Sequence, residues 1–177
     1  MKIFNISNTV NLSDIVYTPK NNKINLIYLD YNYENKIIPF IIETPQLKLL
    51  DIFDINHECF TNELLLDLDD TTKNFINDLE NIVIDYLQTH KDEIGVKTFK
   101  SLIKQFDDDK SINMIKLKLL SKPNLKTNVY DPDGNIITIS DLYSNDYVRI
   151  IMQIVAIWEK DNVFGVYLRP YQIKKYF

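Results

Sequence analysis

Tyrosine and arginine alternate along the segment Val163 to Lys175, near the C-terminus. Tyr167, Arg169 and Tyr171 occupy positions i, i+2 and i+4, so in a β-strand their side chains share one face over about 13 Å. The intervening hydrophobic side chains are predicted to face the core: Phe164, Val166 and Leu168. Nucleobases stack on exposed aromatic rings, and a guanidinium adds phosphate contacts or cation–π attraction. The pattern predicts a stacking surface for single-stranded nucleic acid; the alternative is that tyrosine is simply common on exposed strands.

Further basic and aromatic residues lie on neighbouring predicted strands. Lys116 and Lys118 alternate with aliphatic residues in Asn113 to Leu120 and are expected to point outward. Strict alternation along Tyr147 to Trp158 places Trp158 on the core side, whereas a bulge before the next turn would rotate it outward. The residues predicted to contact nucleic acid are Lys116, Lys118, Lys122, Lys126, Arg149, Trp158, Tyr167, Arg169, Tyr171 and Lys174.

The distribution of charge supports this location. The 177 residues carry a formal net charge of −5, which taken alone argues against a protein that coats nucleic acid. Residues 1–96 contain 7 basic and 16 acidic residues, a net charge of −9, while residues 97–177 contain 13 basic and 9 acidic residues, a net charge of +4. This asymmetry favours a basic face built mainly from the C-terminal half. The alternative is that the charges of both halves are simply solvated surface.

Catalytic and metal-binding patterns are weak. His57 and Cys59 lack the spacing of a zinc site, and the sequence has no GxxxxGK[ST], GxGxxG or GxSxG motif. Acidic clusters at Asp67 to Asp70 and Asp107 to Asp109 could hold magnesium for phosphoryl chemistry, but caps and solvated charge are the favoured interpretation. We therefore expect a protein that is not an enzyme and has no metal or cofactor. One cysteine and no apolar run of about 20 residues favour an intracellular protein without a membrane span.

The elements that must position these residues are mostly short strands. Strand-like runs are expected at 14–17, 24–31, 36–43, 63–69, 113–120, 127–130, 136–139, 147–158 and 163–176. Apolar spacing predicts one amphipathic helix over Asp70 to Gln88, capped by Asp70 or Thr71, and a second helix from Val96 to Phe106. Together they predict a single, mainly β domain over residues 1–177. Its expected architecture is an OB-fold-like antiparallel barrel with a helical insertion at about 70–106.

The order of these segments resembles a known family, the OB-fold single-stranded DNA-binding proteins of nucleocytoplasmic large DNA viruses, similar to helix-destabilising proteins of short-tailed phages. The resemblance rests on IPFIIETPQLKLL (Ile38 to Leu50), ELLLDLD followed by a helix, MIKLKLL, and the C-terminal stretch Tyr147 to Tyr176. It implies a barrel that coats single-stranded DNA in viral replication, recombination or repair, without a cofactor or catalysis.

Two functions follow as hypotheses. The first is sequence-nonspecific binding of single-stranded DNA at a viral replication site in the host cytoplasm or nucleus, with viral replication proteins as further partners. RNA binding stays open, because stacking surfaces accept both nucleic acids unless the 2′-hydroxyl is excluded. The alternative is a β-barrel interaction module of a viral replication complex, which docks through its acidic N-terminal half and binds no DNA.

Overall fold

The structure is a computed structural model, and it describes residues 1–8, 10–19, 26–55, 61–90, 98–105, 111–120 and 126–176. Within these residues the chain is mainly β, with one α-helix and two short 3-10 turns, Leu12–Asp14 and Ile139–Asp141. The first seven strands are β1 (Phe4–Asn5), β2 (Ile15–Pro19), β3 (Leu26–Tyr33), β4 (Lys36–Pro39), β5 (Ile41–Glu43), β6 (Leu47–Ile55) and β7 (Thr61–Asp67). After helix α1 (Asp70–Thr89) follow β8 (Thr98–Phe99), β9 (Ile103–Gln105), β10 (Asn113–Leu120), β11 (Asn128–Tyr130), β12 (Ile136–Ile137), β13 (Tyr147–Lys160) and β14 (Val163–Tyr176).

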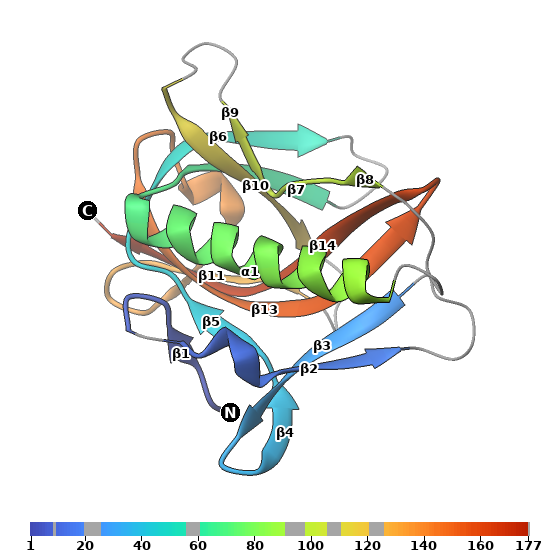
Figure 1. Cartoon of the computed structure of the whole chain (residues 1–177). Helices are drawn as coiled ribbons and strands as arrows, with labels where there is room; N and C mark the ends of the chain where they lie inside the picture. Colours follow the sequence, from blue (N-terminus) through green and yellow to red (C-terminus); the bar gives the residue numbers. More distant parts are fainter. Residues whose placement is uncertain are drawn as a thin grey trace.

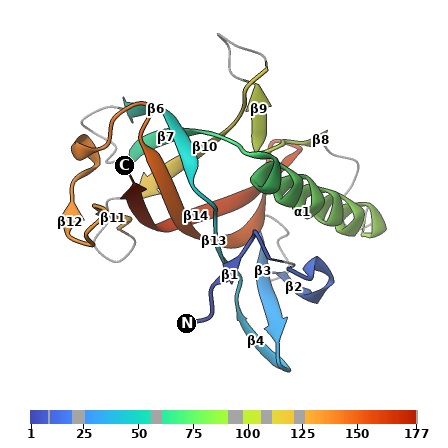
Figure 2. The same ribbon diagram turned by 90° about the vertical axis from the view of Figure 1, so that its left-hand side faces the viewer.

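The antiparallel hairpin of β13 and β14 is the centre of the sheet. The strand order is β12-β11-β14-β13-β6-β7-β10-β9, and β3 and β5 also pair with β13. The sheet curls so that β10 comes back against β14, while α1 crosses the front of the β structure (Figure 1). Seen from the side, β8 and β9 lie at the end of the structure opposite the N-terminus (Figure 2). The result is a curled barrel-like sheet that brings β8, β9 and β10 near the β13–β14 turn.

Helix α1 forms where the apolar spacing predicted it. Phe75, Leu79 and Val83 lie on one face of the helix and are buried in the same core as the strands. The predicted cap is wrong by one or two residues: the side chain of Asp69 accepts a hydrogen bond from the Thr72 amide at 2.9 Å. The acidic cluster at this point therefore includes the helix cap.

The interior alternation of β14 from Phe164 to Leu168, and of β13 as far as Ile154, is also as predicted. Phe164, Val166 and Leu168 are buried, and they pack in one cluster with the buried residues of β13: Val148, Ile150, Met152, Ile154 and Ile157. The pairing of the two strands shifts register twice, between Ile151 and Met152 and between Ile154 and Ala156. Each shift adds an unpaired residue to one strand, and the second one changes which side chains of β13 face outward beyond it.

The predicted second helix is wrong. Within Val96 to Phe106, the described residues form β8 and β9, and residues 96, 97 and 106 lie outside the described residues. The Lys100 amide donates to the Phe164 carbonyl at 2.7 Å, and β9 pairs with β10 in antiparallel register. Hydrogen bonds to neighbouring strands therefore override the helical spacing of the apolar residues. The helical insertion ends at Thr89 instead of extending to about residue 106.

Two other strand predictions need adjustment. Strand β6 (Leu47–Ile55) pairs with β7 and was not predicted. The predicted hairpin at 127–130 and 136–139 exists as β11 and β12, but its second strand is shorter, because Ile139 begins a 3-10 turn. Its connecting turn is closed by the Asn135 amide, which donates to the side chain of Asp131 at 2.8 Å. Asp131 and Asn135 thus close the turn between β11 and β12.

Candidate nucleic-acid interface

A cleft of about 230 Å³ lies between the β9–β10 region and the turn end of β13–β14. Its floor includes apolar atoms of Leu117, Val166 and Leu168. We call its basic and aromatic lining the basic cleft, which consists of Lys100, Lys104, Lys116, Lys118, Trp158 and Tyr167. Four of the predicted contact residues are therefore in one place, together with two lysines that were not among them. Lysines beside exposed rings are the combination that single strands require, since cations meet phosphates and rings stack on bases.

Strand β10 supplies two of the lysines. Ile115, Leu117 and Leu119 are buried, so the alternation of the strand directs Lys116 and Lys118 to the opposite face, as predicted. Their side chains keep 37% and 66% of their exposure. Both ammonium groups can therefore reach a phosphate in the cleft.

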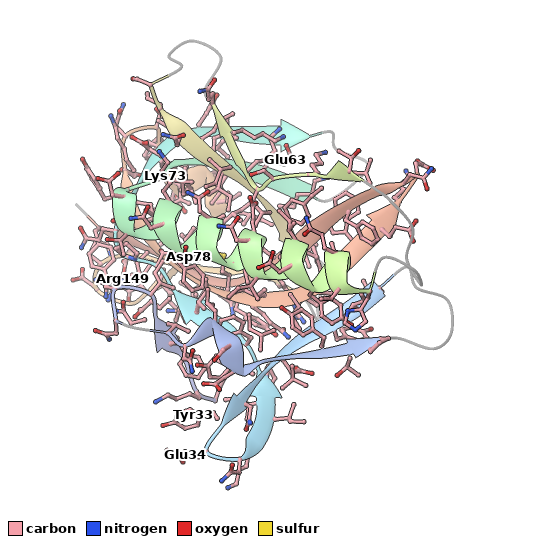
Figure 3. The ribbon with its side chains drawn as sticks, viewed as in Figure 1. Tyr33, Glu34, Glu63, Lys73, Asp78 and Arg149 are labelled. Carbon is pink, nitrogen blue, oxygen red and sulfur yellow. The ribbon has the colours of Figure 1, made fainter. Side chains whose placement is uncertain are left out.

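A buried carboxylate lies beneath these lysines. Glu63 of β7 is only 4% exposed, and its oxygens lie 2.8 Å from Lys116 Nζ and 3.6 Å from Lys118 Nζ. The alternation of β7 places Glu63 on the outer face of the sheet, and its position opposite Lys118 agrees with that direction, but the side chain is buried instead of solvated. Burial is possible because β10 pairs with β7 and places Lys118 opposite Glu63. Figure 3 labels Glu63 in this part of the sheet. Its negative charge offsets part of the positive charge of the cleft.

Trp158 is an aromatic wall of the cleft because of a β-bulge. The register shift between Ile154 and Ala156 inverts the alternation, so Trp158 pairs with Gly165 instead of continuing the buried row. The bulged orientation, the second of the two predicted for Trp158, is the observed one. Gly165 permits it, because a Cβ at that position would lie 2.5 Å from Cζ2 of Trp158. The absence of a side chain at Gly165 therefore leaves the space in which the indole lies.

Tyr167 is the second aromatic residue of the cleft. It pairs with Ala156 across the hairpin and is 38% exposed, while its neighbours Val166 and Leu168 are buried. The small partner leaves the tyrosine ring uncovered by its cross-strand neighbour. Tyr167 therefore offers an accessible ring near Trp158, as the alternation of β14 predicted.

The segment from Lys100 to Lys104 is held in place by a second buried carboxylate. Glu80 of α1 is 7% exposed and accepts hydrogen bonds from the Ser101 hydroxyl, at 2.8 and 3.1 Å, and from the Leu102 amide. Sequence reasoning missed Lys100 and Lys104 as contact residues because it assigned them to a helix. The available signals were their shared basic face on that predicted helix and their place in the basic C-terminal half. Helix α1 thus positions one wall of the basic cleft.

The remaining predicted residues that the structure describes lie outside the cleft. Arg169 and Tyr171 follow Tyr167 along β14: the Arg169 guanidinium lies 4.6 Å from the Tyr171 ring centroid, and the Tyr171 hydroxyl donates to Gln153 at 2.6 Å. Arg149 and Lys174 pair with each other at the other end of the hairpin, where Figure 3 labels Arg149. Lys126 is exposed just before β11. Lys122 lies outside the described residues.

No cluster of three or more His, Cys, Asp or Glu side chains in the described ranges could hold a metal ion. His57, Cys59 and Asp107 to Asp109 fall outside those ranges. Among the described helical residues, no helix is long and apolar enough to cross a membrane.

Solved structures with a similar fold are known. The chain is similar to a C-terminally truncated single-stranded DNA-binding protein from bacteriophage Enc34, with a TM-score of 0.50, 12% identity, and coverage of 93% of this chain and 96% of that chain. The same phage protein in complex with ssDNA gives a TM-score of 0.49 and 11% identity, with 90% and 94% covered. No protein-family model matches the sequence, and no curated protein is significantly similar to it.

These similarities concern the fold. The predicted class, a mainly β, OB-like fold with an inserted helix, is confirmed, and α1 is its helix in the described residues. The more specific assignment to the family from large DNA viruses stays a prediction.

Proposed function

We propose that this protein binds single-stranded DNA without sequence preference, and that the basic cleft is its principal contact site. The observation that carries the proposal is the meeting of Lys100, Lys104, Lys116 and Lys118 with the rings of Trp158 and Tyr167. Lysines bind the backbone phosphates, and aromatic rings stack on any base. The arrangement therefore favours binding of single strands without discrimination between sequences. The shared fold with a phage protein named for single-stranded DNA binding supports the same class of ligand.

The cellular role follows from this activity and from the family resemblance. We assign the protein to the coating and protection of single-stranded DNA during viral replication, recombination or repair, with replication proteins as neighbours. It acts by binding, and the cleft lysines and rings need no cofactor for that task. RNA is the competing ligand, because none of the contacts in the cleft depends on the absence of a 2′-hydroxyl.

The test is a titration with oligo-dT across a range of salt concentrations. Trp158 is the single tryptophan of the chain, so its intrinsic fluorescence reports directly on the cleft. We expect quenching by oligo-dT and a slope of log K against log salt of about −2 to −3, from 0.7 per phosphate for three or four lysines. Duplex DNA of the same length should bind more weakly, and oligo-rU measures the RNA alternative.

Substitutions in the cleft complete the test. Trp158→Ala and Tyr167→Ala should each weaken the binding of a dye-labelled oligo-dT by about 5- to 150-fold, since stacking contributes about 1–3 kcal/mol per base. The label on the DNA replaces the tryptophan signal, because Trp158→Ala removes the single tryptophan of the chain. Tyr33→Ala, at the distant β3–β4 hairpin, is the matched control and should leave binding unchanged. Folded protein that binds no oligo-dT at low salt, or that binds duplex equally well, contradicts the proposal.

A further inference from the structure

A second group of aromatic and basic side chains lies at the other end of the β13–β14 hairpin. We call it the distal patch and define it as Tyr147, Arg149, Lys174 and Tyr176. The guanidinium of Arg149 lies 5.4 Å from the Tyr176 ring centroid, and Lys174 Nζ lies 5.7 Å from it. Tyr147 pairs with Tyr176 across the hairpin and is 44% exposed. The distal patch therefore repeats the chemistry of the basic cleft at a separate place.

The register of the hairpin puts both sites on one face of the sheet. Directly opposed residues of two strands point to the same side, and the pairs that contain buried residues on both strands, such as Ile157–Val166 and Ile150–Ile173, mark the inner side. The pair next to an inner pair points to the opposite face. The outward-facing pairs are therefore Trp158–Gly165, Ala156–Tyr167, Gln153–Arg169 and Arg149–Lys174. At each of the two bulges one strand has an extra residue, so the outward-facing positions shift by one residue there while the outer face itself continues.

The outer face between the two sites carries polar and aromatic groups. Arg169 and Tyr171 lie there with Gln153, and all three side chains are partly exposed. Lys174 lies nine positions after Gly165 in β14, which corresponds to about 30 Å in an extended strand. A ligand that reaches both sites must therefore be an extended chain with repeating charge and repeating rings.

Charge near the distal patch also favours an anionic chain. Among the described residues, the carboxylate beside Arg149 is that of Glu43, at 3.9 Å on the neighbouring strand β5. Lys175 is already engaged, because its Nζ lies 2.9 Å from the carboxylate of Asp146. Lys174 and Arg149 are therefore the cations of the patch that are available to phosphate, next to an exposed tyrosine.

We propose that the distal patch is a second contact site for the same single strand, so that one strand runs along the whole outer face of β13–β14. This inference rests on the proposed function of the basic cleft. It predicts that affinity depends on oligonucleotide length. At the stacked spacing of about 3.4 Å per nucleotide, dT4 covers about 14 Å and reaches one site, while dT16 covers about 54 Å and reaches both.

The experiment compares dT4 and dT16 on the full chain. The double variant Tyr147→Ala, Tyr176→Ala should bind dT16 at least 10-fold more weakly and dT4 within two-fold of the unmodified protein. The variant Arg149→Ala, Lys174→Ala should reduce the salt slope for dT16 by about 1.4 and leave that for dT4 unchanged. The matched control is Lys2→Ala, Tyr33→Ala, which removes another cation–ring pair, with 4.6 Å between Nζ and the ring centroid, at the β3–β4 hairpin.

The outcomes separate this inference from the proposed function. If the unmodified protein binds neither oligonucleotide, the proposed function itself fails. If both oligonucleotides bind but dT16 affinity is unchanged in the folded double variant, the distal patch is not a contact site. An equal loss for dT4 and dT16 also overturns the inference, since the two sites would then not be separate. Tyr147→Ala alone, at an exposed position, serves if the double variant does not fold.

Discussion

The buried carboxylate of Glu63 should limit the affinity of the basic cleft for DNA. Its oxygens lie 2.8 Å from Lys116 Nζ and 3.6 Å from Lys118 Nζ, so a phosphate must compete with Glu63 for the same ammonium groups. Glu63→Gln removes the charge and keeps nearly the same shape. We therefore expect this variant to bind single-stranded DNA more tightly than the unmodified protein.

The size of the gain follows from the exposure of the two lysines. Lys116 and Lys118 keep 37% and 66% of their side-chain exposure, so solvent screens their attraction to Glu63. The free energy of this attraction is therefore about 1 kcal/mol or less. Releasing the lysines from Glu63 corresponds to a gain of about 3- to 5-fold in affinity for single-stranded DNA. The carboxylate neutralises about one of the four cleft lysines, so the salt slope should steepen by about 0.7. The free energy of unfolding should change little, because a neutral amide replaces a buried charge.

The assay is the titration of Trp158 fluorescence with dT16 at several salt concentrations, with urea unfolding measured in parallel. Asp78→Asn is the control, because it raises the net charge equally from the exposed face of α1 (Figure 3). An unchanged salt slope in folded Glu63→Gln would refute the competition argument. Weaker binding would show instead that Glu63 orients the lysines for phosphate.

Three further variants test how the cleft and its support are built. Gly165→Ala places a Cβ 2.5 Å from the indole of Trp158, so the emission of this tryptophan should shift and oligo-dT affinity should fall about 5-fold or more; an unshifted spectrum would contradict the packing. Glu80→Gln weakens the anchor of Ser101 and should lower both oligo-dT affinity and the unfolding free energy, the latter by about 1–3 kcal/mol, measured by urea titration. Burial raises the pKa of Tyr17 from 10.0 to about 12. Between these two pH values the phenol stays protonated in the folded protein and loses its proton in the unfolded chain. Stability should therefore fall as pH rises from about 10 through 12, and the fall should be smaller in Tyr17→Phe.

Features that depend on one strand alone were predictable from the sequence. Lys116 and Lys118 alternate with buried residues within β10, and Tyr167 alternates with Val166 and Leu168 within β14. Period-two patterns of this kind need no knowledge of the neighbouring strand. The outward position of these residues was therefore predicted correctly.

Features that depend on pairing between strands could not be decided from the sequence. The orientation of Trp158 depends on a bulge whose place is fixed by the register of β13 against β14. Glu63 is buried because β10 pairs with β7, and segment 98–105 is extended because Phe164 and β10 offer it hydrogen bonds. The apolar spacing near Phe99 is compatible with a helix, and only tertiary pairing decides against it. The two lysines missed by sequence reasoning belong to that same segment.

The acidic half of the chain contributes directly to the basic cleft. The net charge of −9 over residues 1–96 suggested a surface that repels DNA, yet two of its carboxylates are buried next to the cleft. Glu63 lies beneath the β10 lysines, and Glu80 fixes the segment that carries Lys100 and Lys104. The remaining exposed carboxylates lie on elements such as α1 and repel a polyanion from them. The acidic half therefore acts in two ways: its buried carboxylates support the cleft, and its exposed carboxylates favour binding at the β13–β14 face.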